Sequence, residues 1–186
     1  FSTMHLLKAM QESGVNKIIF SSSATVYGVK NKNPIKENSN LEAINPYGTS
    51  KLISEKLIID QAKINKDFNY IILRYFNPVG YHTSQLLSDD NSKDNLVPNL
   101  INKLRVKKPF SIYGGDYNTK DGTAIRDYIH ISDLISAHLL SLDYILKTKS
   151  EIFNVGIGKG HTVLDVIKSF QKILNKKINF KVVNKR

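Results

Sequence analysis

Two apolar segments separated by one long helical pattern constrain the fold of this chain more than any other feature. NKIIFSSS (16–23) and NYIILRYFN (69–77) are rich in the β-branched and aromatic residues that favour strands. Between them, NPYGTSKLISEKLIIDQAKINK (45–66) has helical spacing and begins with a proline, which suits the first turn of a helix. Nearly continuous apolar strands that alternate with helices are typical of a parallel sheet covered on both faces. The pattern therefore predicts a doubly wound α/β fold.

The same alternation of elements continues along the rest of the chain. The further expected elements are a helix at 2–14, a helix near 96–108, a strand at 110–114, a helix at 132–148, a strand at 151–156, a helix at 161–174 and an edge strand within 174–186. Gly14 is expected to end the first helix in the C′ position. Ser132 is expected to be an N-cap, and Thr162 with Asp165 to form a capping box.

Composition excludes several classes of protein. The 186 residues are 41% apolar, which is enough for a buried core, and the chain has no cysteine for disulfides or thiolate zinc sites. No apolar run reaches the length of about 18 residues that predicts a membrane span, and no secretion signal is visible. The formal net charge of +11 comes from scattered lysines, so we expect a solvated basic surface rather than a nucleic-acid or membrane partner. These features favour a cytoplasmic protein.

Tyr47 and Lys51 are the most suggestive pair of side chains. Residues four apart share one face of a helix, so the two side chains can contact one ligand. A lysine ammonium at roughly 6 Å would stabilise a tyrosine phenolate by ~3 kcal/mol, which is what a catalytic tyrosine base needs. The serines of SSSATVYG (21–28) leave the end of an expected strand, where ligands of open α/β sheets bind. Turn chemistry is the alternative explanation for these serines.

Four motifs, in order, carry a resemblance to a known family. SSSATVYG, NPYGTSK, RYFNPVG and DGTAIRDYIHISDL together resemble the UDP-glucose 4-epimerases of the extended short-chain dehydrogenase/reductase superfamily. The resemblance implies a partial Rossmann-like sheet with an interleaved, smaller substrate-binding region. It also implies NAD as cofactor, a UDP-hexose as substrate and a homodimer. The expected reaction interconverts UDP-glucose and UDP-galactose, in galactose metabolism, through transient oxidation at the sugar C4.

The resemblance also assigns roles to residues. Tyr47 would take the proton from the sugar 4-hydroxyl, Ser23 would hydrogen-bond the same oxygen, and Lys51 would stabilise the phenolate and hold the nicotinamide ribose. The implied catalytic residues are Tyr47, Ser23 and Lys51, and the implied cofactor-binding residues are Ser23, Tyr47, Lys51, Tyr75 and Phe76. The implied substrate-binding residues are Ser23, Ala24, Thr25, Tyr47, Asn77, Asn95, Leu96, Ser111, Ile112, Tyr113, Arg126 and Arg186.

Other polar residues have more ordinary interpretations. Without the motif, Arg126 would be expected to pair with Asp121 or Asp127. The histidines show no metal-ligand spacing, so we predict no metal site. The glycines of NVGIGKGHT (154–162) do not match G-x-G-x-x-G, and we expect Gly156, Gly158 and Gly160 to form a turn with positive φ.

The extent of the resemblance predicts a fragment. Residues 1–78 match the C-terminal half of an NAD-binding domain, and 79–186 match the first part of a nucleotide-sugar-binding region interleaved with it. The glycine-rich turn that holds the NAD pyrophosphate has no counterpart here. A related 4,6-dehydratase is one alternative, although Ser23, Ala24 and Thr25 stand where such enzymes usually carry an Asp-Glu pair. A non-catalytic remnant is the other alternative.

Overall fold

The chain folds into two compact units in a computed structural model that describes residues 2–81, 84, 95–147 and 149–185. Unit 1 comprises residues 1–78 and 131–156, and unit 2 comprises 79–130 and 157–186. The elements are α1 (Ser2–Glu12), β1 (Lys17–Ser23), the 3-10 helix η1 (Ala24–Tyr27), α2 (Pro46–Ile64), β2 (Asn69–Tyr75), β3 (Asn77–Val79), α3 (Leu96–Arg105), β4 (Phe110–Tyr113), β5 (Ile125–His130), α4 (Ile131–Lys147), β6 (Glu151–Val155), β7 (Gly160–Thr162), α5 (Val163–Leu174) and β8 (Phe180–Val183).

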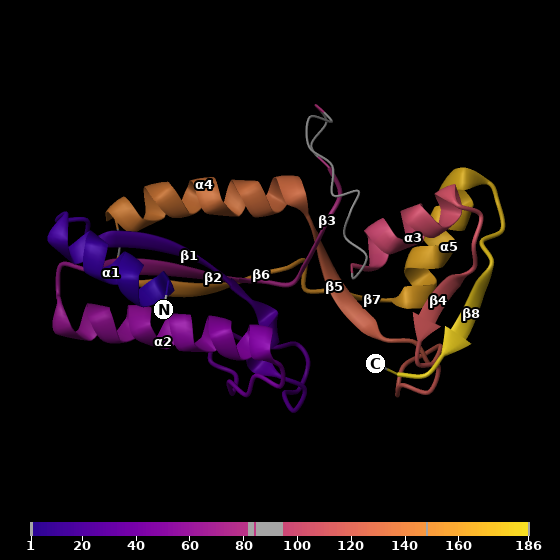
Figure 1. Cartoon of the computed structure of the whole chain (residues 1–186), viewed down its shortest axis with the longest axis horizontal. Coiled ribbons are helices and arrows are strands. Elements are labelled where there is room, and N and C mark those ends of the chain that lie inside the picture. The colour runs from indigo at the N-terminus through magenta and orange to yellow at the C-terminus, as the bar shows by residue number, and fades with distance from the viewer. Residues whose placement is uncertain (1, 82–83, 85–94, 148, 186) are drawn as a thin grey trace. The chain divides into compact units, whose positions relative to one another are not determined.

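Unit 1 is a parallel sheet with helices on both faces. Its strand order is β1-β2-β6, and the register places Ser23 beside Tyr75 and Tyr75 beside Val155. Helix α2 covers one face of this sheet and α4 covers the other, as Figure 1 shows. The central strand β2 is buried on both faces at Ile71, Ile72 and Leu73, as a strand between two helical layers must be. The doubly wound α/β architecture is therefore confirmed.

The ends of the helices in unit 1 follow local chemistry. Gly14 has a φ of 68° and the amide of Val15 donates to the Met10 carbonyl, so α1 ends in a Schellman motif as expected. Helix α2 begins at Pro46, and the Asn45 side chain caps it by accepting from the Gly48 amide at 2.7 Å. These two ends place α1 against α2, where Leu7, Met10 and Ile58 share a core with Phe68.

One predicted helix start is wrong. Helix α4 begins at Ile131, so Ser132 lies inside its first turn and is not the N-cap. The reason is strand β5, which the sequence pattern did not predict and which runs directly into the helix. Asp133 provides the negative charge that the first turn of a helix favours.

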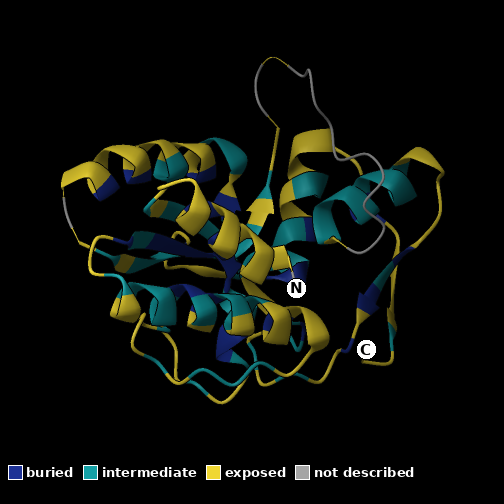
Figure 2. Ribbon diagram, turned by 60° about the vertical axis from the view of Figure 1, so that its left-hand side comes forward, coloured by how far each residue is buried: buried dark blue, intermediate teal, exposed yellow. Residues whose placement is uncertain are grey.

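Unit 2 contains an apolar cluster and short paired strands. Strands β4 and β8 pair in parallel, and β5 and β7 pair antiparallel. The cluster joins α3, β4 and α5, and its buried members are Leu100, Phe110, Ile112, Val163, Ile167 and Ile178. Figure 2 colours the ribbon by burial and shows exposed residues beside intermediate and buried ones along the helices. The edge strand within 174–186 is confirmed as β8, but Phe180 and Val182 remain exposed because the helices cover β4 rather than the sheet's margin.

Helix α5 begins as the sequence predicts. The Thr162 hydroxyl accepts from the Asp165 amide at 3.0 Å, and the Asp165 carboxylate accepts from the Thr162 amide at 3.1 Å, which completes the capping box. Through the described parts of the chain, none of the helices has both the length and the apolar character needed to cross a membrane.

Candidate active site

The three serines at the end of β1 each have a different partner. The Ser21 hydroxyl lies 3.0 Å from Nε2 of His138, whose Nδ1 lies 2.8 Å from the Leu134 carbonyl. Because a carbonyl only accepts, Nδ1 carries a proton, and in the neutral ring Nε2 accepts from Ser21. The Ser22 hydroxyl, on the opposite side of the strand, donates to the Glu55 carboxylate. The serine run therefore links β1 to helices on both faces of the sheet.

Ser23 is both a turn residue and a candidate site residue. It is the N-cap of η1, and its Oγ accepts from the Thr25 amide at 3.3 Å and from the Thr25 hydroxyl at 3.1 Å. Turn chemistry therefore does apply to this serine. A hydroxyl that accepts twice still has its own proton to donate, so the Ser23 O–H can serve a ligand oxygen. The side chain is nearly covered, with 8% of the residue exposed.

Tyr47 and Lys51 face one another on the first turns of α2. Nζ of Lys51 lies 5.7 Å from the centroid of the Tyr47 ring and donates a 2.8 Å hydrogen bond to the Ser21 carbonyl. It also lies 5.1 Å from the centroid of the Phe20 ring, so β1 contributes both a carbonyl and an aromatic ring to the contacts of the ammonium. Tyr47 itself is 52% exposed and can be reached by a ligand. The geometry thus places a fixed cation beside an accessible phenol.

A buried ion pair that the sequence reading missed lies one turn further along α2. Glu55 and Arg74 are only 1% and 2% exposed at their side chains, and Nη2 of Arg74 donates to Oε2 of Glu55 at 2.7 Å. Burial acts to lower the pKa of Arg74, but its hydrogen bonds to Glu55 and Tyr27 raise it overall. Two signals could have drawn attention to the two residues, although neither identifies them as partners. Arg74 interrupts an apolar central strand, and Glu55 follows Lys51 by four residues.

The guanidinium of Arg74 extends this network across the sheet. Nη1 of Arg74 donates at 2.9 Å to the Tyr27 hydroxyl and to the Glu37 carbonyl. The Tyr27 hydroxyl in turn donates to the Asn154 side chain on β6 at 2.7 Å. Burial raises the pKa of Tyr27, which keeps the phenol protonated and able to donate. One chain of hydrogen bonds therefore joins α2, β2, η1 and β6.

The remaining predicted residues of unit 1 follow the ends of β1 and β2. Ala24 and Thr25 belong to η1, directly after Ser23. Tyr75 ends β2 beside Ser23, with its ring centroid 6.4 Å from that of His138. The Phe76 amide donates to the Val155 carbonyl at 3.1 Å, and Asn77 opens β3. The sheet therefore gathers these residues at the carboxyl ends of neighbouring parallel strands, the usual place for a ligand in such a fold.

Other predicted substrate contacts belong to unit 2. Asn95 is the N-cap of α3 and Leu96 is its first residue, as expected for groups at a helix start. Ser111, Ile112 and Tyr113 form most of β4, where Ile112 is buried in the apolar cluster and Tyr113 is exposed. Arg186 lies outside the described residues.

Arg126 is exposed on β5, and its Nη1 donates to the carbonyl of Ile125 at 2.7 Å. The two nearby aspartates bond to other groups. Asp121 accepts from the Thr123 and Thr162 hydroxyls, at 2.7 and 2.6 Å, and this lowers its pKa against the effect of burial. Asp127 accepts from the amides of Ile157 and Gly158.

The glycine-rich turn is held by a side chain. Gly158 has the expected positive φ of 71°, whereas Gly156 and Gly160 do not, so the expectation is wrong for those two. At Gly160 the small residue is needed for space, because a Cβ atom would lie 2.4 Å from the Ile125 side chain. Since Asp127 accepts from the amides of Ile157 and Gly158, this turn does not present those donors to a phosphate.

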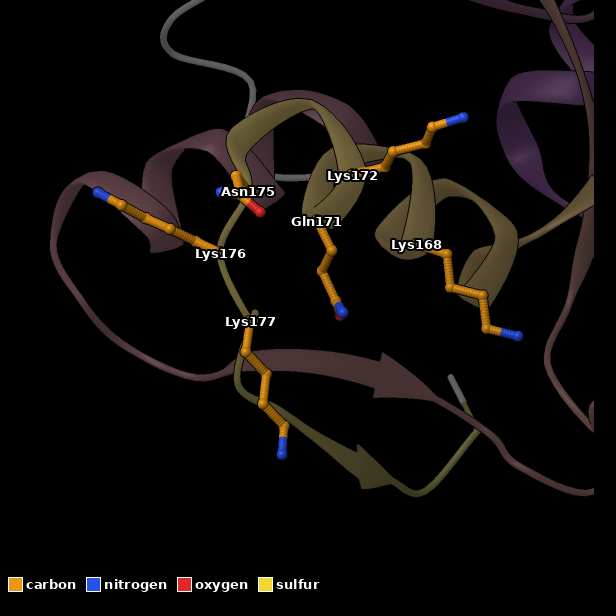
Figure 3. A pocket seen from close by; sticks show the side chains of 6 residues that line it. All are labelled: Lys168, Gln171, Lys172, Asn175, Lys176 and Lys177. Atoms are coloured by element: carbon orange, nitrogen blue, oxygen red, sulfur yellow. The ribbon is translucent and has the colours of Figure 1, made fainter.

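A separate hollow of about 430 Å³ lies at the C-terminal end of α5. It is lined by Lys168, Gln171, Lys172, Asn175, Lys176 and Lys177. Figure 3 shows that the four lysine side chains point in different directions, as mutually repelling charges do, and none of the predicted site residues lines the hollow. Over the described residues, no three His, Asp or Glu side chains gather closely enough to hold a metal ion.

Comparisons with known proteins agree with these motifs. The UDP-glucose 4-epimerase of Bacillus subtilis (strain 168) is 41% identical over 189 residues, which cover 99% of this chain and 56% of the relative. That of Pasteurella multocida is 44% identical over 186 residues, or 97% of this chain and 55% of the relative. This chain thus spans about half the length of the curated relatives it matches.

Solved structures are similar over the same extent. The UDP-glucose 4-epimerase from Bifidobacterium longum in complex with NAD+ and UDP matches with a TM-score of 0.92 and 43% identity, covering 100% of this chain and 56% of that one. The enzyme from Stenotrophomonas maltophila, with bound NAD and formylated UDP-arabinopyranose, has a TM-score of 0.91 and 39% identity, covering 99% and 56%. Residues 2–156 match the family model of the NAD dependent epimerase/dehydratase family, and the chain belongs to that family.

Proposed function

We propose that this chain carries the proton-transfer residues of a UDP-glucose 4-epimerase, which interconverts UDP-glucose and UDP-galactose by transient oxidation at the sugar C4. One observation carries the proposal. The Lys51 ammonium is fixed between the Ser21 carbonyl and the Tyr47 ring, beside an accessible phenol. The relatives named UDP-glucose 4-epimerase support the choice of reaction.

Each of the three side chains has one task in this reaction. Tyr47 takes the proton of the sugar 4-hydroxyl, and the Lys51 ammonium stabilises the phenolate that makes this possible. The Ser23 hydroxyl donates a hydrogen bond to the same sugar oxygen and keeps its own proton. After the configuration at C4 has inverted, the same groups act in reverse and return the proton to the sugar 4-oxygen. The hexose must be loosely held for this to occur, whereas the nucleotide must be anchored.

The nicotinamide end of NAD fits the groups present. An ammonium has three donors, and Lys51 uses one on the Ser21 carbonyl, which leaves two for ribose hydroxyls. Ser23 ends β1 and Tyr47 lies on the first turn of α2, and Tyr75 and Phe76 supply aromatic surface at the end of β2. When bound, NAD would accept a hydride from the sugar C4 and return it to the opposite face.

The nucleotide part of the substrate is assigned to the remaining polar residues. Ala24, Thr25 and Asn77 follow the strands of unit 1 that carry the catalytic groups. In unit 2, the start of α3 at Asn95 and Leu96 offers the backbone donors of a helix N-terminus to phosphate. We assign Ser111, Ile112 and Tyr113 to the uracil, and Arg126 and Arg186 to the diphosphate, whose oxygens suit the planar guanidinium.

A homodimer and a cytoplasmic location complete the proposal. Helices α1 and α2 expose Met4, Leu6 and Ile53, large apolar side chains that a second copy could cover. The absence of cysteine suits a reducing compartment. A 4,6-dehydratase is less well supported, because Ala24 and Thr25 provide no carboxylates for the elimination of water.

The test replaces the matching segment of the Bacillus subtilis relative with this chain and measures conversion of UDP-galactose to UDP-glucose by chromatography. The chimeric enzyme should convert the sugar, and Tyr47→Phe should abolish turnover while NAD stays bound. Lys51→Met should shift the activity profile to higher pH. The matched control is Tyr70→Phe, which removes a hydroxyl elsewhere in unit 1 and should leave turnover unchanged. Undiminished turnover in Tyr47→Phe contradicts the mechanism, and a folded, NAD-bound chimera without conversion contradicts the function.

A further inference from the structure

Glu55 occupies a position with a direct geometric relation to the candidate catalytic pair. It follows Lys51 by four residues and Tyr47 by eight, so all three side chains lie along one face of α2. Tyr47 is exposed, Lys51 is half-buried and Glu55 is buried. Burial therefore increases along this face from Tyr47 to Glu55, and Glu55 is the most buried of the three side chains.

The Glu55 carboxylate bonds to two strands at once. It accepts from the Ser22 hydroxyl on β1. It also accepts from Arg74 on β2, with Nε at 3.0 Å from Oε1 and Nη2 at 2.7 Å from Oε2. Both partners are themselves buried, so neither bond is open to exchange with water. One side chain thus fixes α2 relative to neighbouring parallel strands.

Successive residues of β1 hold successive turns of α2. The Ser21 carbonyl accepts from Lys51, and the next residue, Ser22, donates to Glu55. Moving the helix by one residue would turn its side chains by about 100° and would break both contacts together. The two contacts therefore define the register of the helix, and with it the place where the Lys51 ammonium stands.

Stability alone does not explain a charge at this position. A buried ion pair can often be replaced by apolar side chains of similar volume without loss of stability. What an apolar residue cannot supply is direction, because apolar contacts tolerate sliding and rotation that a two-oxygen hydrogen-bonded group does not. A directional group is needed only where a side chain on the helix must stand at a defined place.

We propose that Glu55 is the positioning residue of the Tyr47–Lys51 pair, acting through Ser22 and Arg74 to hold Lys51 on the Ser21 carbonyl beside the tyrosine. The catalytic role of Glu55 rests on the proposed function. Its effect on the position of Lys51 does not, because the position of the Lys51 ammonium can be measured in this chain without turnover.

The first experiment is made on the 186-residue chain, with its lysine ammonium groups labelled with nitrogen-15 for NMR. A Lys51 ammonium bonded to a carbonyl exchanges its protons slowly and gives a resonance, which Lys51→Met identifies by its loss. Glu55→Gln should remove that resonance at a temperature where circular dichroism shows a folded chain. Ile58→Ala, on the same helix and equally buried, is the matched control for lost stability and should retain it. A resonance that persists in Glu55→Gln, or is lost equally in Ile58→Ala, overturns the proposal.

The second experiment measures kcat in the chimeric enzyme. Glu55→Gln should lower kcat by about 100-fold with little change in KM, the size of effect that a misplacement of 1 Å produces. If Glu55→Gln does not fold, Ser22→Ala leaves the ion pair in place and should still lower kcat by roughly tenfold. Ile58→Ala should leave kcat of the folded enzyme unchanged. An unchanged kcat in the folded Ser22 variant contradicts positioning, whereas unchanged turnover in Tyr47→Phe contradicts only the proposed function.

Discussion

Within each of its two units, this chain uses a different kind of buried contact. Unit 1 has a buried ion pair, Glu55 with Arg74, at the place where α2 meets β1 and β2. Unit 2 has an apolar cluster that joins α3, β4 and α5, and the hydrogen bonds of its Thr162–Asp165 capping box lie at the start of α5. The buried ion pair occurs in the unit that carries the candidate catalytic residues. Directional contacts occur beneath Tyr47 and Lys51, where side-chain position matters, and apolar packing suffices where a helix only has to cover a sheet.

The largest effect is expected from breaking the ion pair on one side. Arg74→Met leaves the Glu55 carboxylate buried without its cation, and the free energy of unfolding should fall by about 3–5 kcal/mol. Urea denaturation followed by circular dichroism measures this loss.

The matched control removes both charges. In Arg74→Met combined with Glu55→Leu, no buried charge is left unpaired, so most of the lost stability should return. If the double variant is as unstable as the single one, the pair stabilises unit 1 by more than charge compensation, and the contrast between the units is wrong.

The apolar cluster of unit 2 should respond to lost volume instead of lost charge. Ile167 is 1% exposed at the centre of that cluster, and Ile167→Ala should lower the free energy of unfolding by about 3 kcal/mol through the cavity it leaves. The control is Ile173→Ala on the same helix, where the residue is 79% exposed and the change should be within about 0.5 kcal/mol. Equal losses in the two variants would show that α5 is not anchored by its apolar stripe.

Much of this organisation could be predicted from the sequence, because it depends on local patterns. The order of strands and helices in unit 1, the Gly14 helix end and the capping box at Thr162 all follow from spacing and turn chemistry within a few residues. The facing of Tyr47 and Lys51 follows from helix geometry alone.

The contacts that the sequence did not predict join residues far apart in the chain. Nothing local to Arg74 identifies Glu55 as its partner, and the link from Ser22 to Glu55 spans 33 residues. Strand β5 was missed because its motif, IRDYIH, mixes charged and apolar residues without a clear period, and its neighbours in the sheet, β3 and β7, are three residues each. Tertiary pairing, rather than propensity, decides such cases.

A smaller effect is expected at the start of α5. Thr162→Ala removes the N-cap bond to the Asp165 amide and the 2.6 Å bond to Asp121, so the free energy of unfolding should fall by about 2 kcal/mol. Thr162→Ser keeps both bonds and is the control. Hydrogen exchange of the first amides of α5 locates the effect, and exchange that is equally fast in the serine variant would mean that the threonine methyl group, not the hydroxyl, stabilises this end.

The smallest effect is a pH dependence at the same helix end. The Lys120 ammonium, with the Thr162 amide, holds the pKa of Asp165 at about 2, below its ordinary value of 3.8. A carboxylate whose pKa is lower in the folded state stabilises the fold above its unfolded pKa, and this stabilisation is lost as the pH falls toward the folded value. Asp165→Asn should therefore lower the free energy of unfolding by roughly 1 kcal/mol near neutral pH, allowing for solvent screening of the exposed lysine. The difference from the unmodified chain should shrink between about pH 4 and pH 2, where the native carboxylate becomes protonated.

Urea titrations across this range measure the difference, with Asp143→Asn on an exposed position of α4 as the control. A difference that stays constant down to about pH 2 would show that the Asp165 charge does not contribute, and that the cap acts through its hydrogen bonds alone.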